Sequence, residues 1–286
     1  MGTYTGTSAG NRITPTAVST GVTRDPAESR PSAVADTIDG LGGADTLDGG
    51  GGDDLIYGGT GRDRLYGRDG NDTIYGKTSG VASAADADTI YGGNGNDIIY
   101  GNGGEEDTGF ADGNDTIYGN AGNDQLYGKL GNDTLNGGAG SDRLAAYRGN
   151  DRLSGGGGDD FLRGGDGLDR MSGGAGNDTY NYDLASNSPA GARRDVILDF
   201  NGVGPAAGDI IDLATLDANI DTPGNEAFSF IAGARFTAPG QVRVSDRDGD
   251  TLIQANTSGA PGAELEILVE DGGATPGRWV AEDFIL

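Results

Sequence analysis

The sequence contains no cysteine and no histidine, and each absence excludes a class of protein chemistry. Without cysteine the chain forms neither a disulfide framework nor a thiolate metal site. Without histidine it lacks imidazole ligands for zinc and every catalytic triad that depends on a histidine base. Proline is also scarce, with 9 residues, and glycine does not recur at every third position, which excludes a collagen helix. We therefore expect no catalysis that depends on imidazole or thiol, and only oxygen-ligated metal sites.

Basic residues are few, with 19 Lys and Arg against 45 Asp and Glu, and the formal net charge is -26. Hydrophobic residues make up 34% of the chain, so the charge opposes collapse more strongly than in an ordinary globular protein. This charge argues against nucleic acid and anionic lipid as partners. No apolar run is long enough to span a membrane, and the start MGTYTGTSAGN lacks the features of a cleaved signal peptide. Cations are the expected partners.

Glycine, in contrast, is abundant, with 57 residues, and most of it belongs to a nine-residue repeat in residues 36–181. The repeat reads G-G-x-G-x-D-x-U-x, where U is apolar, as in GGAGNDTYN at 173–181. Two segments, KTSGVASAA and NGGEEDTGFA, interrupt the phase, and we interpret them as loops inserted within a repeat. The apolar residue at position eight is, in chain order, Ile38, Leu47, Ile56, Leu65, Ile74, Ile90, Ile99, Ile117, Leu126, Leu135, Leu144, Leu153, Leu162, Met171 and Tyr180.

This pattern predicts an all-β fold, a parallel β-roll. The first six positions favour turns, because glycine permits positive φ, and the last three form a short strand with the apolar residue inward. Two repeats then make one flattened coil of 18 residues, and successive coils stack as parallel strands about 4.8 Å apart. By composition we divide the chain into an N-terminal extension or degenerate cap (1–35), the roll (36–181) and a C-terminal cap (182–286).

The aspartate at position six points to a metal. Stacking places residue i over residue i+18, so Asp45 lies near Asp63, and such carboxylates repel unless a cation lies between them. Calcium takes 6–8 oxygen ligands, carbonyls included, whereas zinc and copper prefer histidine or cysteine. A single Asp beside glycine is often only a solvated turn residue, but a phased column is not explained that way. The predicted calcium ligands are Asp45, Asp54, Asp63, Asp72, Asp88, Asp97, Asp115, Asp124, Asp133, Asp142, Asp151, Asp160, Asp169 and Asp178.

The repeats resemble the calcium-binding nonapeptides of RTX (repeats-in-toxin) proteins. In that family each calcium lies between successive coils, bound by two position-six aspartates and by carbonyls of positions two and four of one loop and one and three of the next. The resemblance implies an ion between Asp45 and Asp63 with carbonyl ligands from Leu41, Gly43, Gly58 and Thr60. By the same rule it implies carbonyl ligands at Gly50, Gly52, Gly67, Asp69, Gly92, Asn94, Asn120, Gly122, Gly131, Gly137, Ala139, Gly140, Gly149, Gly155, Gly157, Gly158, Gly164, Asp166, Gly173 and Ala175.

The phased aspartates, counting Asp36, form two alternating columns of eight and seven members. These columns have room for up to about 13 calcium ions between successive members. Asp36 lacks the preceding glycines and is left out of the ligand set, and the two inserted loops distort the coils that contain them.

After residue 182 the glycine content falls and short apolar runs appear. Leu265, Ile267 and Val269 alternate with glutamates, which predicts a half-exposed antiparallel strand, and several such strands indicate a small sandwich-like cap on the roll. Asp246, Asp248 and Asp250 in SDRDGDT resemble half of a calcium loop, but we favour a turn.

The C-terminal segment is similar to the C-terminal domain of serralysin-type secreted metalloproteases. The similarity lies in DVILDFNGVGPAAGDIIDL, AFSFIAGARF and the terminal Asp283, Phe284, Ile285 and Leu286. In that family an acidic residue followed by three apolar ones belongs to an uncleaved type I secretion signal. The resemblance implies export by the type I secretion machinery of a Gram-negative bacterium to the extracellular space. The zinc motif of those proteases, HExxHxxGxxH, is excluded here because there is no histidine.

We interpret the chain as a secreted, non-catalytic, monomeric calcium-binding roll that folds outside the cell. Two alternatives stay open: a C-terminal module of a larger exoenzyme (protease, lipase or epimerase), or a stand-alone surface or matrix protein that binds glycans. For the latter, outward tyrosines at position nine are candidate stacking platforms, although tyrosine also simply favours strands. These are Tyr57, Tyr66, Tyr75, Tyr91, Tyr100, Tyr118 and Tyr127.

Overall fold

The computed structural model describes residues 34–77, 86–102, 113–191, 194–202, 208–220, 226–258, 262–271 and 278–286, and the backbone of four short strands before residue 34. The chain divides into two compact units, Met1–Tyr147 and Arg148–Leu286. The composition-based bounds at 35 and 181 stay a prediction. In the described part, no helix is long and apolar enough to cross a membrane.

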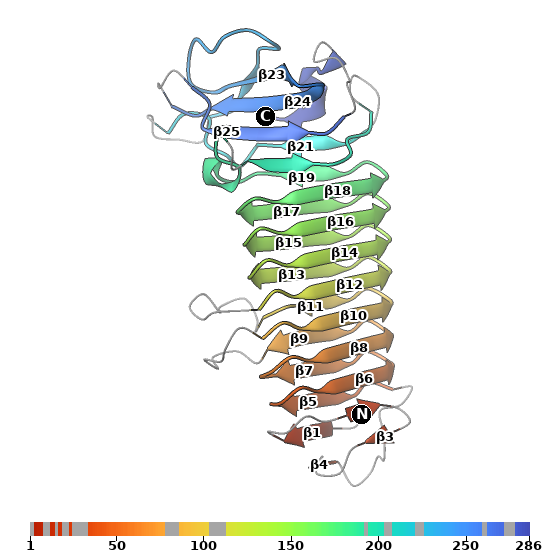
Figure 1. Ribbon diagram of the computed structural model, residues 1–286. Coiled ribbons are helices and arrows are strands. Elements are labelled where there is room, and N and C mark those ends of the chain that lie inside the picture. Colours follow the sequence, from red (N-terminus) through yellow and green to blue (C-terminus); the bar gives the residue numbers. More distant parts are fainter. Residues whose placement is uncertain are drawn as a thin grey trace. The chain divides into compact units, whose positions relative to one another are not determined.

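The first unit consists of two parallel sheets whose strands alternate along the chain (Figure 1). The first sheet contains β5 (Thr37–Leu41), β7 (Leu55–Gly59), β9 (Thr73–Lys77), β11 (Ile98–Tyr100) and β13 (Gln125–Leu130). The second contains β6 (Thr46–Gly51), β8 (Arg64–Asp69), β10 (Thr89–Asn94), β12 (Thr116–Ala121) and β14 (Thr134–Ala139). The last strand, β15 (Arg143–Arg148), lies where the two units meet in the sequence.

The register of these strands follows the repeat. Ile38 pairs with Ile56 and Ile56 with Ile74, each 18 residues on, as one coil of two repeats requires. Across the two insertions the register skips and resumes: Leu65 pairs with Ile90, and Ile90 with Ile117. The insertions therefore lie within coils without disturbing the stack, although most of their residues fall outside the described part of the chain.

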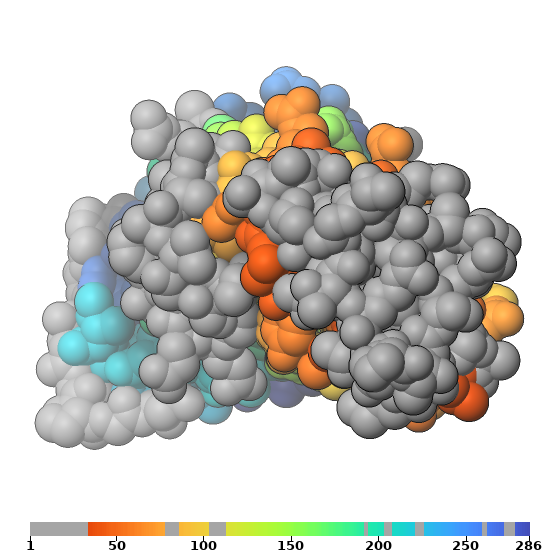
Figure 2. All heavy atoms as spheres, turned by 90° about the horizontal axis from the view of Figure 1, so that it is seen from below, coloured from red at the N-terminus to blue at the C-terminus, as the bar shows by residue number. Residues whose placement is uncertain are grey.

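Four short strands of the N-terminal extension continue the same arrangement. β1 (Thr3–Thr7) runs parallel to β5 and β2 (Arg12–Thr14) runs parallel to β6. Two further strands, β3 (Ala17–Val18) and β4 (Thr23–Arg24), pair antiparallel with β2 and β1. The space-filling view of Figure 2 looks along the stacking direction of this unit and shows parts of its first coils in orange.

The second unit repeats the two-sheet plan and then changes direction. One sheet contains β17 (Phe161–Asp166), β19 (Thr179–Asn181), β21 (Ile210–Asp212) and β26 (Phe284–Ile285), all parallel. The other contains β16 (Arg152–Gly157), β18 (Arg170–Ala175), β20 (Asp195–Ile197), β25 (Leu265–Val269), β24 (Asp250–Asn256), β23 (Gln241–Arg247) and β22 (Ser229–Phe230). In it β25, β24 and β23 are antiparallel, so the C-terminal strands extend a roll sheet. The predicted fold class, a parallel β-roll with a C-terminal antiparallel region, is confirmed.

The core of the roll is a single line of side chains on the inner face of each sheet. All fifteen predicted position-eight residues are buried, none more than 1% exposed. The end of the second unit adds an aromatic cluster, in which Trp279 packs on Phe200 (4.7 Å between ring centres) and Phe284 (5.7 Å). This unit also contains two 3-10 turns: η1 (Ala185–Asn187), which contacts β17 and β25, and η3 (Ala281–Asp283), which contacts β21 and β26.

The acidic segment SDRDGDT forms the turn that the sequence favoured. Asp248 and Gly249 both have positive φ, 60° and 96°, and join β23 to β24 by a two-residue hairpin. Arg247 pairs with Asp250 across it.

Candidate calcium sites along the aspartate ladders

The position-six aspartates are buried, and hydrogen bonds link them into ladders. In each, the backbone N–H of one aspartate donates to Oδ1 of the aspartate one coil further on, as from Asp54 to Asp72 (2.8 Å). The ladder that contains this pair also joins Asp36 to Asp54, Asp72 to Asp97, Asp97 to Asp124 and Asp124 to Asp142. The other ladder of the first unit joins Asp45, Asp63, Asp88, Asp115 and Asp133. In the second unit Asp151 is joined to Asp169 and Asp160 to Asp178.

Several ladder aspartates have one carboxylate oxygen that this bonding does not use. Within the described part of the chain, buried Oδ2 atoms without a hydrogen-bond partner occur in Asp54, Asp63, Asp72, Asp97, Asp124, Asp169 and Asp178. A buried ionised oxygen without a partner destabilises the folded state, because it has lost its hydrogen bonds to water and no protein group replaces them. Above the raised pKa values of these carboxyls, the ladders therefore need a cation at these atoms.

The space beside each orphaned oxygen is lined with further oxygen. A Cβ atom built on Gly67 would meet both Asp72 Oδ2 and the carbonyl oxygen of Gly92 from the next coil. The same pairing of a carboxylate with a position-one carbonyl surrounds Gly49, Gly58, Gly92 and Gly119. No side chain fits there, yet oxygen atoms converge on it, which is the surrounding that calcium prefers.

The surroundings of the predicted carbonyl ligands depend on their position in the repeat. The position-one carbonyls of Gly58, Gly67, Gly92, Gly137 and Gly173 come close to the glycine cradles of the preceding coil. The position-three carbonyls of Thr60, Asn94, Ala139, Asp166 and Ala175 instead accept backbone N–H groups from the previous coil. A carbonyl has a second lone pair, so these groups can still ligate an ion. The assignment of individual ligands stays a prediction.

Position-two and position-four carbonyls point along the stack at the glycine one coil further on. The carbonyl of Leu41 faces Gly59, and that of Gly43 faces Gly61, whose φ of 118° and close approach to Gly43 O exclude any other residue. Among the described residues, no group of three or more His, Cys, Asp or Glu could hold a metal ion. An ion in these ladders therefore takes most of its ligands from the backbone.

Burial shifts the titration of the ladder carboxyls toward neutral pH. Desolvation raises the pKa of Asp54 to about 7, of Asp97 to about 7 and of Asp63 to about 8, partly offset by the N–H bond that each accepts. The pKa of Asp72, Asp124 and Asp142 rises to about 6 for the same reason. A bound cation would reverse this shift, because it stabilises the ionised form.

The ladders contain two aspartates that the sequence reasoning missed. Asp169 N–H donates to Asp195 Oδ1 (2.9 Å), and Asp178 N–H donates to Asp209 Oδ1 (3.0 Å). Neither falls in the nine-residue phase, but each is followed two positions later by a fully buried isoleucine, Ile197 and Ile211. This Asp-x-apolar spacing was the available signal.

The two added aspartates end their ladders in different ways. Asp209 Oδ2 accepts the N–H of Asn201 (2.8 Å), so both of its carboxylate oxygens have protein partners. Asp195 Oδ2 is buried and has no hydrogen-bond partner in the described region, and burial raises the pKa of Asp195 strongly. The N–H of Asp195 donates to Ser188 Oγ (2.7 Å), which takes the place of a next aspartate. Asp195 thus resembles the ladder aspartates, whereas Asp209 closes its column.

The outward tyrosines form ladders of their own. Neighbouring rings stack nearly parallel, with centres 4.8 to 5.2 Å apart. Most ring faces are therefore covered by another tyrosine, and the exposed face of Tyr66 lies under the Arg68 guanidinium at 4.7 Å. Because a sugar stacks on a free aromatic face, the rings inside these ladders offer no such platform, and the glycan alternative stays a prediction.

Comparison with known proteins agrees with this geometry. A family model described as "RTX calcium-binding nonapeptide repeat (4 copies)" matches residues 33–65, 48–78, 84–105, 111–144 and 145–180. The matched segments are RTX calcium-binding nonapeptide repeats. The RTX repeats coincide with the two-sheet roll and with the aspartate ladders, and Asp195 and Asp209 lie beyond their last match.

Two solved structures are similar to parts of the chain. One is the AlgE6R2 subunit of the Azotobacter vinelandii mannuronan C5-epimerase, with 26% identity, a TM-score of 0.32, and coverage of 60% of this chain and 92% of that one. The other is the AlgE6R3 subunit of the same epimerase, with 27% identity, a TM-score of 0.27, and coverage of 74% and 83%. No curated protein matches the chain significantly. The chain thus carries a calcium-binding RTX β-roll.

Proposed function

We propose that the chain is a secreted, non-catalytic protein whose RTX roll folds when it binds calcium outside the cell. The observation that carries the proposal is the set of buried, unpartnered Oδ2 atoms, such as those of Asp54, Asp72 and Asp97. In a low-calcium cytosol these carboxylates and a net charge of -26 keep the repeats unfolded, which suits passage through a narrow channel. At extracellular calcium the free energy of binding becomes free energy of folding.

The position of the C-terminal residues supports export before folding. Asp283 and Phe284 are buried, Phe284 pairs with Ile211 across β26 and β21, and its ring packs 5.3 Å from Phe230. Asp283 Oδ2 also accepts the N–H of Val280 (2.7 Å). In the folded chain Asp283 and Phe284 are covered while Ile285 is exposed, so a secretion apparatus can read the whole segment only while the chain is unfolded. Calcium-gated folding provides that interval.

Deleting residues 283–286 is expected to abolish export through a type I secretion apparatus. The chain is unfolded in the cytosol on this account, so the deletion removes the signal without a folding defect to confuse the result. The measurement compares the protein in the medium with that retained in cells expressing the exporter. Replacing Ile220, an exposed residue far from the terminus in sequence, by alanine is the control and leaves export unchanged. Export of the truncated chain at the wild-type level would contradict the assignment of the signal.

Replacing one ladder aspartate is expected to cost calcium as well as stability. Asp97 lies between Asp72 and Asp124, so Asp97→Asn keeps an oxygen acceptor but removes the charge from two neighbouring gaps. We expect about one or two fewer bound ions and a higher calcium midpoint of folding, with about 2.7 kcal/mol lost per site at about 100 times its Kd. Bound calcium is counted by atomic emission after equilibrium dialysis.

The matched control for this substitution is Asp53→Asn. Asp53 is exposed and its Oδ1 accepts the N–H of Asn71 (2.8 Å), a contact that asparagine keeps. The control removes the same charge next to the ladder but outside it. Equal calcium stoichiometry and equal midpoints in the two variants would show that only overall charge matters, against the proposal.

A further inference from the structure

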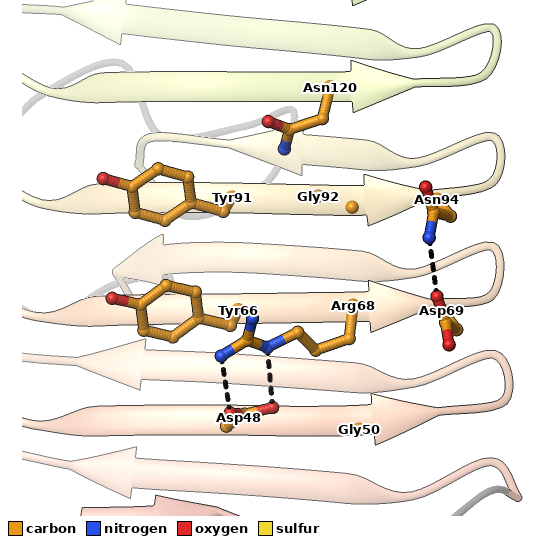
Figure 3. Close-up of a pocket in the computed structure, with 10 residues that line it drawn as sticks. Asp48, Gly50, Tyr66, Arg68, Asp69, Tyr91, Gly92, Asn94 and Asn120 are labelled. Carbon is orange, nitrogen blue, oxygen red and sulfur yellow. Dashed lines mark hydrogen bonds and ion pairs between the residues drawn. The ribbon is translucent and has the colours of Figure 1, made fainter.

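The outer face of the second sheet in the first unit carries a groove whose side chains take no part in the proposed calcium sites, although some of its backbone carbonyls are predicted calcium ligands. It has a volume of about 630 Å³, within the range of small-molecule sites, and crosses β6, β8, β10 and β12. Figure 3 shows its walls: Tyr66 and Tyr91 on one side, and Asp69 with Asn94 on the other. Its floor is glycine backbone, at Gly50, Gly92 and Gly93. It is polar on several sides, where Asp48, Arg68, Asp69, Asn94 and Asn120 line it.

Two of the lining side chains are held in a disfavoured backbone conformation. Position two of the repeat needs positive φ, and on this sheet it is glycine at Gly50, Gly93 and Gly138. Arg68 and Asn120 occupy it with φ of 89° and 79°, which disfavours a residue with a side chain. Both line the groove. Leu41, Lys129 and Tyr147 also have positive φ but lie outside the groove, so what distinguishes Arg68 and Asn120 is that both line one concave surface.

Arg68 and Asn120 lie on either side of a coil that has glycine, Gly93, at the same position. Gly93 pairs with Arg68 on one side and with Asn120 on the other, so the two side chains are two strands apart, about 10 Å. A Cβ on Gly93 would meet the carbonyl oxygen of Arg68, so glycine is required between them. The separation of the two side chains is therefore a fixed feature of the stacked coils.

The groove offers both hydrogen-bond donors and acceptors. Asp48 accepts two bonds from Arg68, at Nε (3.2 Å) and Nη2 (3.0 Å), which orients the guanidinium while the arginine side chain stays 52% exposed. Asn94 Nδ2 donates to Asp69 Oδ1 (2.7 Å) at the opposite wall. The guanidinium of Arg68, the amides of Asn94 and Asn120, and the carboxylate of Asp69 all line the groove. Such alternating polar groups suit a ligand with many hydroxyls.

Charge and ring geometry narrow the ligand class. An anionic ligand is disfavoured, because the lining cation Arg68 is already paired with Asp48 and a second carboxylate, that of Asp69, lines the same groove. A cationic ligand would need open aromatic faces, but Tyr66 and Tyr91 stack on each other at 5.0 Å and Arg68 covers the next face. We propose that this groove binds a neutral oligosaccharide, whose hydroxyls pair with Arg68, Asn94 and Asn120 over the Gly92–Gly93 floor.

The test uses the calcium-loaded full chain and isothermal titration calorimetry. The probes are maltohexaose, cellohexaose and laminarihexaose, with hexagalacturonate as an acidic counterpart. We expect binding of at least one neutral probe and none of the acidic one. Asn120→Gly should weaken that binding about fivefold, and Arg68→Gly about tenfold, as loss of a neutral and of a charge-assisted hydrogen bond implies. Both variants put glycine where neighbouring coils have it, so the backbone carbonyls and the fold are retained.

Tyr147→Gly is the matched control, because Tyr147 also occupies position two with positive φ (77°) and lies outside the groove. It should bind the neutral probe as the unmodified chain does. Binding of only hexagalacturonate, binding of no probe, or unchanged affinity in both Arg68→Gly and Asn120→Gly would overturn the proposal. Circular dichroism of each sample with and without calcium distinguishes a failure of the groove proposal from a failure of the proposed calcium-dependent folding. A chain that folds with calcium but binds no sugar overturns the groove alone, and one that does not respond to calcium overturns the proposed function.

Discussion

Removal of calcium at about pH 7.5 is expected to expose the backbone amides of every RTX repeat to solvent exchange. Without the ion, the buried Oδ2 atoms of the ladders, such as those of Asp63 and Asp124, have no compensating charge. Each filled site contributes about 2.7 kcal/mol at about 100 times its Kd, so a few sites already equal the whole stability of an ordinary domain, about 5–15 kcal/mol. The loss should therefore be complete and not a local loosening.

Hydrogen–deuterium exchange with mass spectrometry measures this effect peptide by peptide. Peptides from β6 to β18 should be protected in calcium and exchange fully in a chelator, and protection should return when calcium is restored. Magnesium at the same concentration is the control and should not restore protection, because it demands a regular octahedral shell and dehydrates reluctantly. Protection that survives in the chelator would mean that the ladders are held without a metal.

Acidification is expected to return β-structure to the metal-free chain. In the folded roll the pKa of Asp54, Asp63 and Asp97 is about 7, 8 and 7, above the ordinary value of 3.8 because burial disfavours the charged form. The folded state thus binds more protons than the unfolded state between about pH 4 and about pH 8. The stability that these carboxyls contribute is full below about pH 4 and is lost as the pH rises through about 6 to 8.

The measurement is far-UV circular dichroism in a chelator, with the pH lowered from about 7.5 to about 4.5. The β-sheet signal should increase on acidification, since protonated carboxyls can be buried without a cation. With calcium present, acidification should instead destabilise the fold, because protons compete with the ion for the carboxylates. The calcium concentration at the midpoint of folding should therefore rise as the pH falls. A metal-free chain that loses structure in acid would show that the ladder carboxylates are not desolvated as the structure implies.

Much of the roll could be predicted because one repeat determines both its turn and its strand. Ile56 had to face inward, and Asp54 had to follow a glycine turn, whatever the rest of the chain did. The 18-residue coil then placed Asp54 over Asp72 without any long-range information. The hairpin at Asp248 and Gly249 was local in the same sense, since two residues with positive φ fix it.

The sequence was less informative where a contact depends on which coils become neighbours. Asp195 joins the ladder through Asp169, 26 residues away and out of phase, and Ser188 replaces the next aspartate. Glu266 was expected on an exposed strand face, but it is 9% exposed because Gly191 N–H donates to it (2.8 Å) and Arg194 forms an ion pair with it (3.3 Å). Neither contact follows from spacing along the chain.

The surroundings of the tyrosines could not be predicted for the same reason, because they too depend on which coils become neighbours. Position nine predicted that Tyr66 and Tyr91 point outward, and both lie on the outer face of the second sheet. Their availability to a sugar depended on the spacing between coils, which closes each ring against the next at 5.0 Å. The concave, polar surface lies beside them, at Arg68 and Asn120, where two repeats depart from glycine.

A calcium titration that starts in a chelator and follows far-UV circular dichroism and Trp279 fluorescence together tests the central claim most directly. Trp279 is 3% exposed and packs on Phe200 and Phe284, so its emission reports the C-terminal end while circular dichroism reports the strands. The account predicts one cooperative coil-to-β transition near millimolar calcium in which both signals change together. A chain that is already folded in the chelator, with neither signal responding to calcium, would contradict it.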